Sequence, residues 1–365
     1  MRTILALAAL TLLFATPGCV PAAGRHKDVS PPENQPLVGP GSSEYPHATV
    51  RVEGHGEGNE RYWLCEPSGP IPNSAPVVVF LHGYGALDTK PYEGWLRHLA
   101  RRGNIVIYPK FQDTLFEPPE NYASNAAAAI KAALALLESG EDYHVMPRRE
   151  EFAIVGHSAG GMTCANLAAR FAEFGLPTPR VAMPIQPGGN GPGTRDPIPA
   201  ADYSKIPGDC LLLAVFGDSD GVVGSYCAEK IFVEAGARDE NKNLVEFRSD
   251  NYGDEVLVAD HFTPTAGKDD ADFFDWYGYW KLFDGLCDAA FRGINRQYAL
   301  GDTPEQRFMG RFDDGHMVNE LRVTLGGAQV TPNEDFKPIY DAWGKPYRKG
   351  GPLRDLIANR LRHGD

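Results

Sequence analysis

The chain has 365 residues, of which 42% are hydrophobic and 23% charged, and its formal net charge is −13. This length suits one α/β domain with additions or two average domains, and the composition is that of a protein that buries a core. The acidic charge, without any basic run, argues against nucleic acid as a partner and against adsorption to an anionic membrane surface.

The N-terminus has the pattern of an export signal. Arg2 precedes an apolar run, Ile4–Ala15, that is too short to span a bilayer. Cys19 follows Thr16-Pro17-Gly18, and this arrangement resembles the lipobox of bacterial lipoproteins. The resemblance implies that Cys19 carries lipid and anchors an exported protein to a membrane. Ordinary cleavage near Ala22 is the alternative, and it would give a secreted or periplasmic protein.

The next segment is expected to be a spacer. Residues 1–23 are assigned to the signal peptide, and residues 24–47 contain several Pro, Ser and Gly residues with almost no apolar periodicity. Such a composition predicts a flexible tether, which suits a protein hung from an anchor.

Beyond residue 47, apolar runs alternate with helical periods. The predicted strands are Ala48–Glu53, Arg61–Cys65, Val77–Leu81, Ile105–Tyr108, Phe152–Val155, Arg180–Ile185, Cys210–Phe216 and Leu244–Phe247. The predicted helices are Glu93–Arg101, Tyr122–Leu137, Met162–Phe174, Ser225–Ala235 and Asp272–Phe291. This alternation predicts an α/β fold whose mainly parallel sheet is covered by helices on both faces. Past Asn295 the alternation stops, with short strands expected in Arg307–Leu325 and a helix over Pro352–Arg362.

The cysteines suggest little chemistry of their own. Five follow Cys19, so at least one of them stays free even where export permits disulfides. Cys164 and Cys210 fall inside a predicted helix and strand and are expected to be inert core residues. Cys227 and Cys287 are left as a possible bridge. No Cys-x-x-Cys or His-x-x-x-His spacing points to a metal, and neither a metal nor a cofactor is expected.

One stretch has the pattern of a nucleophile elbow. A short apolar strand ends at Val155, Gly156-His157-Ser158-Ala159-Gly160 follows at once, and a helical period begins at Met162. Strand, tight turn and helix are the context that a G-x-S-x-G motif requires. The glycines let the two backbones approach closely, and Ser158 is then expected at the strained tip with its hydroxyl exposed.

A nucleophilic serine needs a histidine base and an orienting carboxylate, which in an elbow of this kind follow in the order acid, then histidine. His261 follows an apolar run and is favoured as the base over His316 and over His363 near the C-terminus. Two carboxylates come after the strand Cys210–Phe216. Asp220 is favoured as the acid because it reaches further along its loop, whereas Asp218 is suited to capping the turn.

Backbone amides are expected to complete the site. Ala159 stands at a helix N-terminus, where partial positive charge favours an oxyanion. A second donor should follow an early strand. Gly83 and Gly85 flank Tyr84 there, so the Tyr84 amide is predicted to face Ser158.

Four motifs in this order resemble the serine hydrolases of the dienelactone-hydrolase, cutinase and polyester-hydrolase group: HGYG (82–85), GHSAGG (156–161), GDSDGVV (217–223) and DHFTP (260–264). The group's G-x-x-D-x-x-V pattern is matched by Gly217, Asp220 and Val223, and its oxyanion donors carry over to Tyr84 and Ala159. The resemblance, which covers 48–291, implies an α/β-hydrolase catalytic domain over 48–295, with 296–365 as a C-terminal extension packed on or beside it.

The expected function is hydrolysis of carboxylic esters through an acyl-enzyme on Ser158, with a small-molecule or polymer ester as substrate. The connection Gln186–Asp209 shows no amphipathic helix, so no large cap domain and an open site are predicted. Two alternatives stay open: an exported serine peptidase or amidase, and a non-catalytic surface binding protein on a hydrolase scaffold. Contact with a membrane is expected only through lipid on Cys19.

Overall fold

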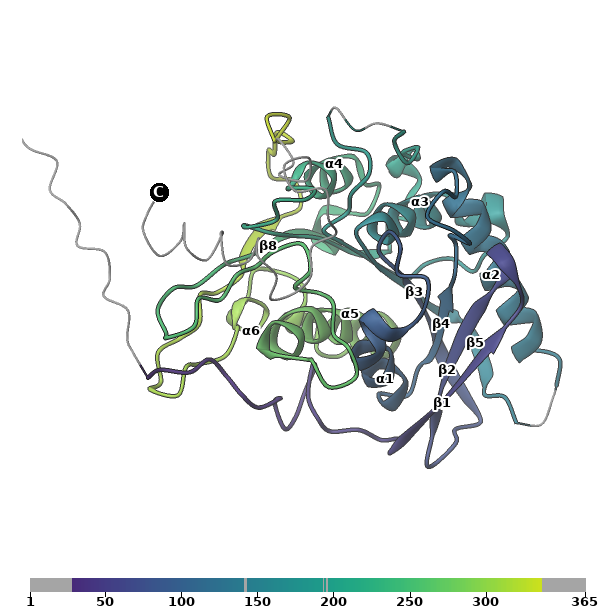
Figure 1. Cartoon of the computed structure of the whole chain (residues 1–365), viewed down its shortest axis with the longest axis horizontal. Helices are drawn as coiled ribbons and strands as arrows, with labels where there is room; N and C mark the ends of the chain where they lie inside the picture. Colours follow the sequence, from purple (N-terminus) through teal and green to yellow (C-terminus); the bar gives the residue numbers. More distant parts are fainter. Residues whose placement is uncertain (1–27, 141–142, 193, 195, 337–365) are drawn as a thin grey trace, which may run out of the picture.

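The computed structural model describes residues 28–140, 143–192, 194 and 196–336 (Figure 1). The predicted signal peptide, Cys19 and the predicted helix Pro352–Arg362 lie outside these residues. Within the described part of the chain, no helix is long and apolar enough to cross a bilayer.

A single sheet of nine strands organises the described residues, in the order β1-β2-β4-β3-β5-β6-β7-β8-β9. The strands are β1 Thr49–His55, β2 Tyr62–Ser68, β3 Ser74–Leu81, β4 Ile105–Pro109, β5 Met146–His157, β6 Val181–Ile185, β7 Leu211–Gly217, β8 Lys242–Phe247 and β9 Arg322–Leu325. The six strands from β4 to β8 in this order run parallel, while β1, β2 and β9 are antiparallel additions at the two edges. The predicted α/β architecture is confirmed, and it is that of the α/β-hydrolase fold.

Helices cover both faces of the sheet (Figure 1). They are α1 Glu93–Arg101, α2 Tyr122–Leu137, α3 Ala159–Phe174, α4 Tyr226–Glu234, α5 Trp280–Arg292 and the short α6 Pro304–Arg307, and a π-helical stretch, Phe274–Tyr279, leads into α5. Because side chains alternate along a strand, neighbouring residues of β3 enter different cores. Val79 packs in the cluster with α2 and α3, whereas Val78 packs in the cluster with α1 and α5.

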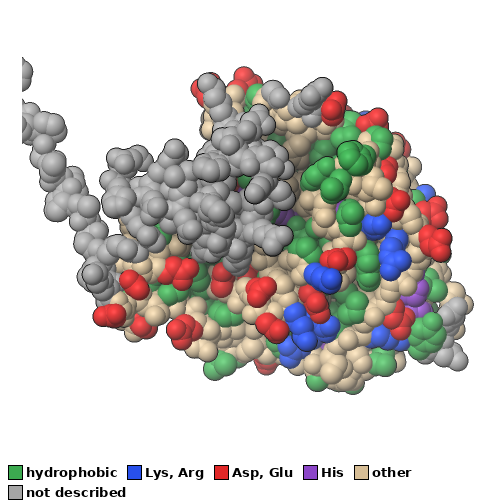
Figure 2. Space-filling view, in the orientation of Figure 1, with side chains coloured by type: hydrophobic (Ala, Val, Ile, Leu, Met, Phe, Trp, Pro, Cys, Tyr) green, Lys and Arg blue, Asp and Glu red, His purple; other side chains and the backbone are tan. Residues whose placement is uncertain are grey.

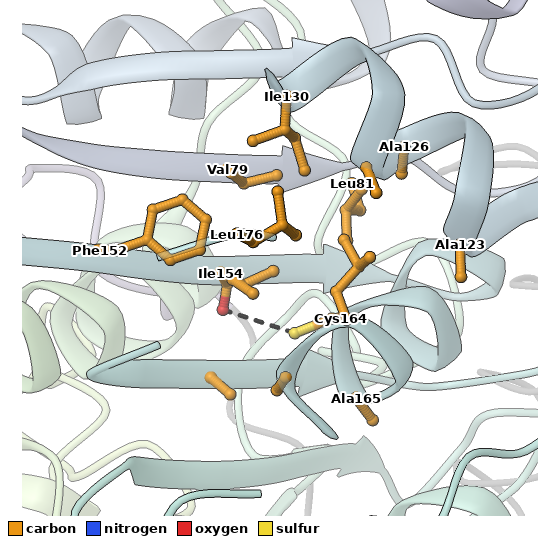
Figure 3. Close-up of a cluster of buried hydrophobic side chains, with 14 of the residues drawn as sticks. Val79, Leu81, Ala123, Ala126, Ile130, Phe152, Ile154, Cys164, Ala165 and Leu176 are labelled. Atoms are coloured by element: carbon orange, nitrogen blue, oxygen red, sulfur yellow. Dashed lines mark hydrogen bonds between the residues drawn. The ribbon is translucent and has the colours of Figure 1, made fainter. Parts of the chain in front are cut away.

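The core beneath the elbow is built from small side chains on the helices and larger ones on the strands. Figure 3 shows Val79 and Leu81 of β3 and Phe152 and Ile154 of β5 beside Ala126 and Ile130 of α2. Alanines on α2 and α3 let the helices lie close to the sheet, so the start of α3 is held firmly against the ends of β3 and β5.

The described flanks are packed onto this body. In residues 28–47, which the sequence assigns to a flexible tether, the Gly41 amide donates to Asp284 Oδ2 over 2.9 Å, and Ser42 is fully buried. A Cβ on Gly41 would lie 2.1 Å from the Trp276 carbonyl oxygen, so the segment passes close to the body. At the other end β9 pairs with β8. The described part of the tether is therefore held in place, and β9 adds the last strand to the sheet.

All five cysteines among the described residues are buried and free. The possible bridge between Cys227 and Cys287 is wrong, because Cys227 packs with α2 and α3 while Cys287 packs with α1 and α5. The sheet therefore stands between the two sulfur atoms.

Candidate active site

The serine is presented by a strained turn between β5 and α3. Ser158 has φ 57° and ψ −121°, a conformation that a residue with a side chain rarely adopts. A Cβ on Gly156 would lie 2.2 Å from the Gly160 carbonyl oxygen, and one on Gly160 would lie 2.2 Å from the Leu81 carbonyl oxygen. Only glycine fits at both positions, so the motif has the backbone geometry that its sequence predicts.

The structure brings Ser158, His261 and Asp220 together in one hydrogen-bonded line. His261 Nε2 lies 2.9 Å from Ser158 Oγ, and His261 Nδ1 lies 2.8 Å from Asp220 Oδ2. Since the carboxylate only accepts, Nδ1 donates to it and Nε2 is free to accept the serine proton. The amides of Val222 and Val223 donate to Asp220 Oδ1 and fix the carboxylate in turn.

The competing carboxylate is occupied elsewhere. Asp218 accepts hydrogen bonds from the amide and hydroxyl of Ser249 and from the hydroxyl of Ser219. It therefore ties the loop after β7 to the loop after β8. Its neighbour two residues on, Asp220, is 5% exposed and turns toward His261.

The competing histidines lie away from Ser158 or outside the described residues. His316 is exposed and stacks on Tyr252, with 3.7 Å between ring centroids. His363 lies outside the described residues. Asp260, beside His261, accepts from the Phe262 amide and so shapes the turn that carries the imidazole.

Two backbone amides are available near the Ser158 hydroxyl. Ala159 opens α3, where the first amides have no intrahelical acceptor. A Cβ on Gly83 would lie 3.5 Å from Ser158 Cβ, so the loop after β3 passes directly beside Ser158. The Gly83 amide is taken by the Tyr92 hydroxyl, at 2.9 Å. The Tyr84 amide, next in the chain, makes no hydrogen bond within the described residues.

Two buried side chains behind these groups escape sequence analysis. Tyr92 has its hydroxyl 2.7 Å from His157 Nδ1. His157 Nε2 lies 2.7 Å from the His261 carbonyl oxygen. Burial lowers the pKa of His157 well below its usual range, so this ring is neutral. A sequence signal for His157 exists, because it is a polar residue at the first x of G-x-S-x-G. A polar side chain buried at that position needs hydrogen-bond partners.

The entrance to the site is uncapped in the described residues. Between Gln186 and Asp209 they contain no α-helix, only the short 3-10 turn Tyr203–Lys205. Tyr84, Leu115 and Phe116 expose 55, 50 and 92% of their surface, and the Tyr84 hydroxyl donates to the Leu115 carbonyl oxygen at 2.6 Å. Apolar surface therefore adjoins the loop that carries the Tyr84 amide.

Surface charge and a further cavity also bear on where a site lies in the described part of the chain. Figure 2 shows acidic side chains scattered over one face, with basic side chains in smaller groups. A surface cavity of about 370 Å³ lies between the end of α3 and residues 199–205, away from Ser158. No cluster of His, Cys, Asp and Glu suited to a metal ion is found among the described residues.

Comparison with known proteins finds similarity to chlorophyllases over parts of the chain. A family model described as Chlorophyllase matches residues 67–183, which include the Tyr84 loop and Ser158 but neither Asp220 nor His261. The chloroplastic Chlorophyllase-1 proteins of Citrus unshiu and Citrus sinensis are each 30% identical over 96 residues, which is 26% of this chain and only 29% of their own length. Chlorophyllase-2 of Arabidopsis thaliana is 26% identical over 258 residues, 69% of this chain and 74% of the relative. These similarities support the α/β-hydrolase fold.

Proposed function

We propose that the protein hydrolyses carboxylic esters through an acyl-enzyme intermediate. Ser158 Oγ attacks the ester carbonyl while His261 Nε2 takes its proton, and Asp220 holds the imidazole in the required tautomer. The amides of Tyr84 and Ala159 stabilise the negative oxygen that forms, and losing one such donor costs about 3 kcal/mol of activation free energy. His261 returns the proton to the leaving alcohol, and water then releases the acid by the same route.

One observation carries the proposal: the unbroken line from Asp220 Oδ2 through His261 to Ser158 Oγ, with contacts of 2.8 and 2.9 Å, at the tip of a strained elbow. A serine in such a conformation persists only where the surrounding structure holds it, and strain of this kind concentrates at active sites.

The test is the Ser158→Ala variant. It should lose turnover of p-nitrophenyl butyrate by at least about 10³-fold while keeping the melting temperature of the native protein, because the small change removes only the nucleophile. Ser124→Ala is the matched control, since the Ser124 hydroxyl contacts only the Asn121 carbonyl oxygen at an exposed site on α2. Activity retained in Ser158→Ala would remove this serine from the mechanism.

Two kinds of reagent distinguish the esterase from the alternative functions. A fluorophosphonate should label Ser158 in an esterase and in a peptidase or amidase, but not in a binding protein with a decayed site. Matched ester and anilide substrates then separate the two enzymes. We favour the esterase because the described residues between Gln186 and Asp209 contain no cap helix that would gate a peptide, and because the relatives carry the name chlorophyllase.

We propose an ester with an apolar portion, given the exposed apolar side chains beside the Tyr84 loop. A panel of p-nitrophenyl esters of graded acyl length, together with chlorophyll a, tests this. Equal kcat/KM across the whole panel would reject it.

We also propose that the protein is exported and anchored through Cys19. Globomycin treatment of the producing bacterium tests the anchor, because it should cause a diacylated precursor to accumulate. The absence of that precursor would leave the secreted or periplasmic form.

A further inference from the structure

We propose that Tyr92 and His157 are positioning residues that set the oxyanion loop and the His261 loop at fixed places relative to Ser158. The inference rests on the proposed esterase function. It concerns three loops that are far apart in the sequence and that one chain of hydrogen bonds joins: Gly83 N to Tyr92 Oη, Tyr92 Oη to His157 Nδ1, and His157 Nε2 to the His261 carbonyl oxygen.

The protons in this chain have one consistent arrangement. The His261 carbonyl oxygen can only accept, so His157 Nε2 carries the hydrogen and Nδ1 is the bare, accepting nitrogen. The Tyr92 hydroxyl must then donate to Nδ1, and its oxygen accepts from the Gly83 amide. Every donor points the same way, from the oxyanion loop toward the catalytic histidine.

The chain is fully enclosed, which gives it rigidity. Tyr92 is 1% and His157 2% exposed, so neither can exchange its partner for water. The Tyr92 ring packs on Phe80 and faces the His157 ring edge-on. Removing one member would leave a buried polar group unpaired, so the three links hold or loosen together.

Each end of the chain fixes a group that the chemistry needs. At one end, the Tyr92 hydroxyl accepts from the Gly83 amide, so that amide cannot serve an oxyanion. The amide of the next residue, Tyr84, is then the donor that can turn toward Ser158. At the other end, His157 holds the peptide of His261, while Gln186 Nε2 donates to the preceding carbonyl of Asp260 at 2.7 Å. Two successive carbonyls are thus tied down beside the imidazole that moves the proton.

The test compares Tyr92→Phe, His157→Phe and their double variant. Each single variant should lower kcat for p-nitrophenyl butyrate about 10–100-fold with KM changed less than about threefold, because an oxyanion donor and the base act in the transition state. The double variant should lose no more than the worse single variant, since breaking one link already uncouples the loops. His157→Gln, whose amide can both donate and accept, should recover part of the loss.

A transition-state analogue separates positioning from a general loss of packing. The inhibition constant of an alkyl trifluoromethyl ketone, which forms a hemiketal oxyanion on the serine, should rise by about the same factor as kcat/KM falls. Tyr203→Phe is the matched control, because among the described residues the hydroxyl of this equally buried tyrosine donates only to Met162 Sδ, at 3.9 Å, and the kcat of the variant should stay within about twofold of native.

Three results would overturn the inference: native kcat in both single variants, losses that add in the double variant, or unchanged inhibition by the ketone. A fall in melting temperature that alone accounts for the loss in both phenylalanine variants, with no recovery in His157→Gln, would also overturn it. The esterase proposal is judged separately, by Ser158→Ala, by fluorophosphonate labelling and by the matched ester and anilide substrates.

Discussion

At the scale of single residues, the sequence predicts the candidate triad better than the buried side chains that hydrogen-bond behind it. The motif around Ser158 and the order of the later motifs point to His261, and the structure places that ring beside the serine. The choice between Asp218 and Asp220 depends on side-chain direction within one loop, for which spacing gives only a preference. The link from Tyr92 to His157 spans 65 residues and leaves no local pattern.

His82, at the end of β3, gives a prediction about acid stability. Its ring is fully buried and stacks on Phe111, with 4.1 Å between centroids, and Nδ1 donates to the Gly83 carbonyl oxygen. Burial lowers the pKa of His82 to about 4, whereas the unfolded chain has the ordinary value of about 6.5. Between about pH 6.5 and 4, the His82 imidazole is therefore protonated in the unfolded state and neutral in the folded state.

Neutral His82 therefore contributes its full stabilisation above about pH 6.5. As the pH falls toward about 4, the free energy of unfolding decreases by about 3 kcal/mol because of this residue. His82→Phe keeps the ring stack and removes the titration. In urea denaturation its free energy of unfolding should fall less between those two pH values than that of the native protein. His316→Gln, at an exposed site, is the control, and its free energy of unfolding should fall between those two pH values as much as that of the native protein. An unchanged slope in His82→Phe would contradict the prediction.

At the scale of elements, local pattern predicts most of what positions the site. The apolar runs mark the parallel strands, and the elbow glycines mark the contact between β5 and α3. Two features do not follow from local pattern. The predicted helix Asp272–Phe291 begins as the π-helical stretch Phe274–Tyr279. The strand β9 falls within Arg307–Leu325, where short strands are expected, but its pairing with β8 has no local pattern.

The elbow contact predicts a large effect of one methyl group. Gly160→Ala would put a Cβ 2.2 Å from the Leu81 carbonyl oxygen, which is backbone and has no room to yield without moving β3. We expect a loss of about 1–3 kcal/mol in the free energy of unfolding, together with most of the proposed esterase activity. Gly208→Ala is the matched control, because its nearest neighbour would be Arg238 Cγ at 3.6 Å. Equal stability of the two variants would contradict this account of the turn.

At the scale of the whole molecule, the flanks are where sequence analysis is weakest. Gly41 and Asp284 are 243 positions apart, and β9 pairs with a strand that ends at Phe247. Neither contact has a local signature, so the first segment reads as a tether and the last as an addition. The long-range pairing shows that residues 322–325 belong to the main sheet.

Truncation tests the part that β9 plays. A chain ending at residue 320 leaves the edge of β8 without its partner, and an unpaired edge next to a hydrophobic core promotes aggregation. We expect this chain to be largely insoluble, while a chain ending at residue 336 stays monodisperse in size-exclusion chromatography. Equal solubility of both chains would show that β9 is dispensable.

The five buried thiols have a practical consequence. Cys65 and Cys287 lie in one core, while Cys164, Cys210 and Cys227 lie in the other. Because burial also raises the pKa of these thiols, to about 12 for Cys65 and about 11 for Cys227, they are slow nucleophiles until the chain opens. Alkylation followed by peptide mass spectrometry would therefore measure the rate at which each core opens, separately for the two cores and without any engineered probe.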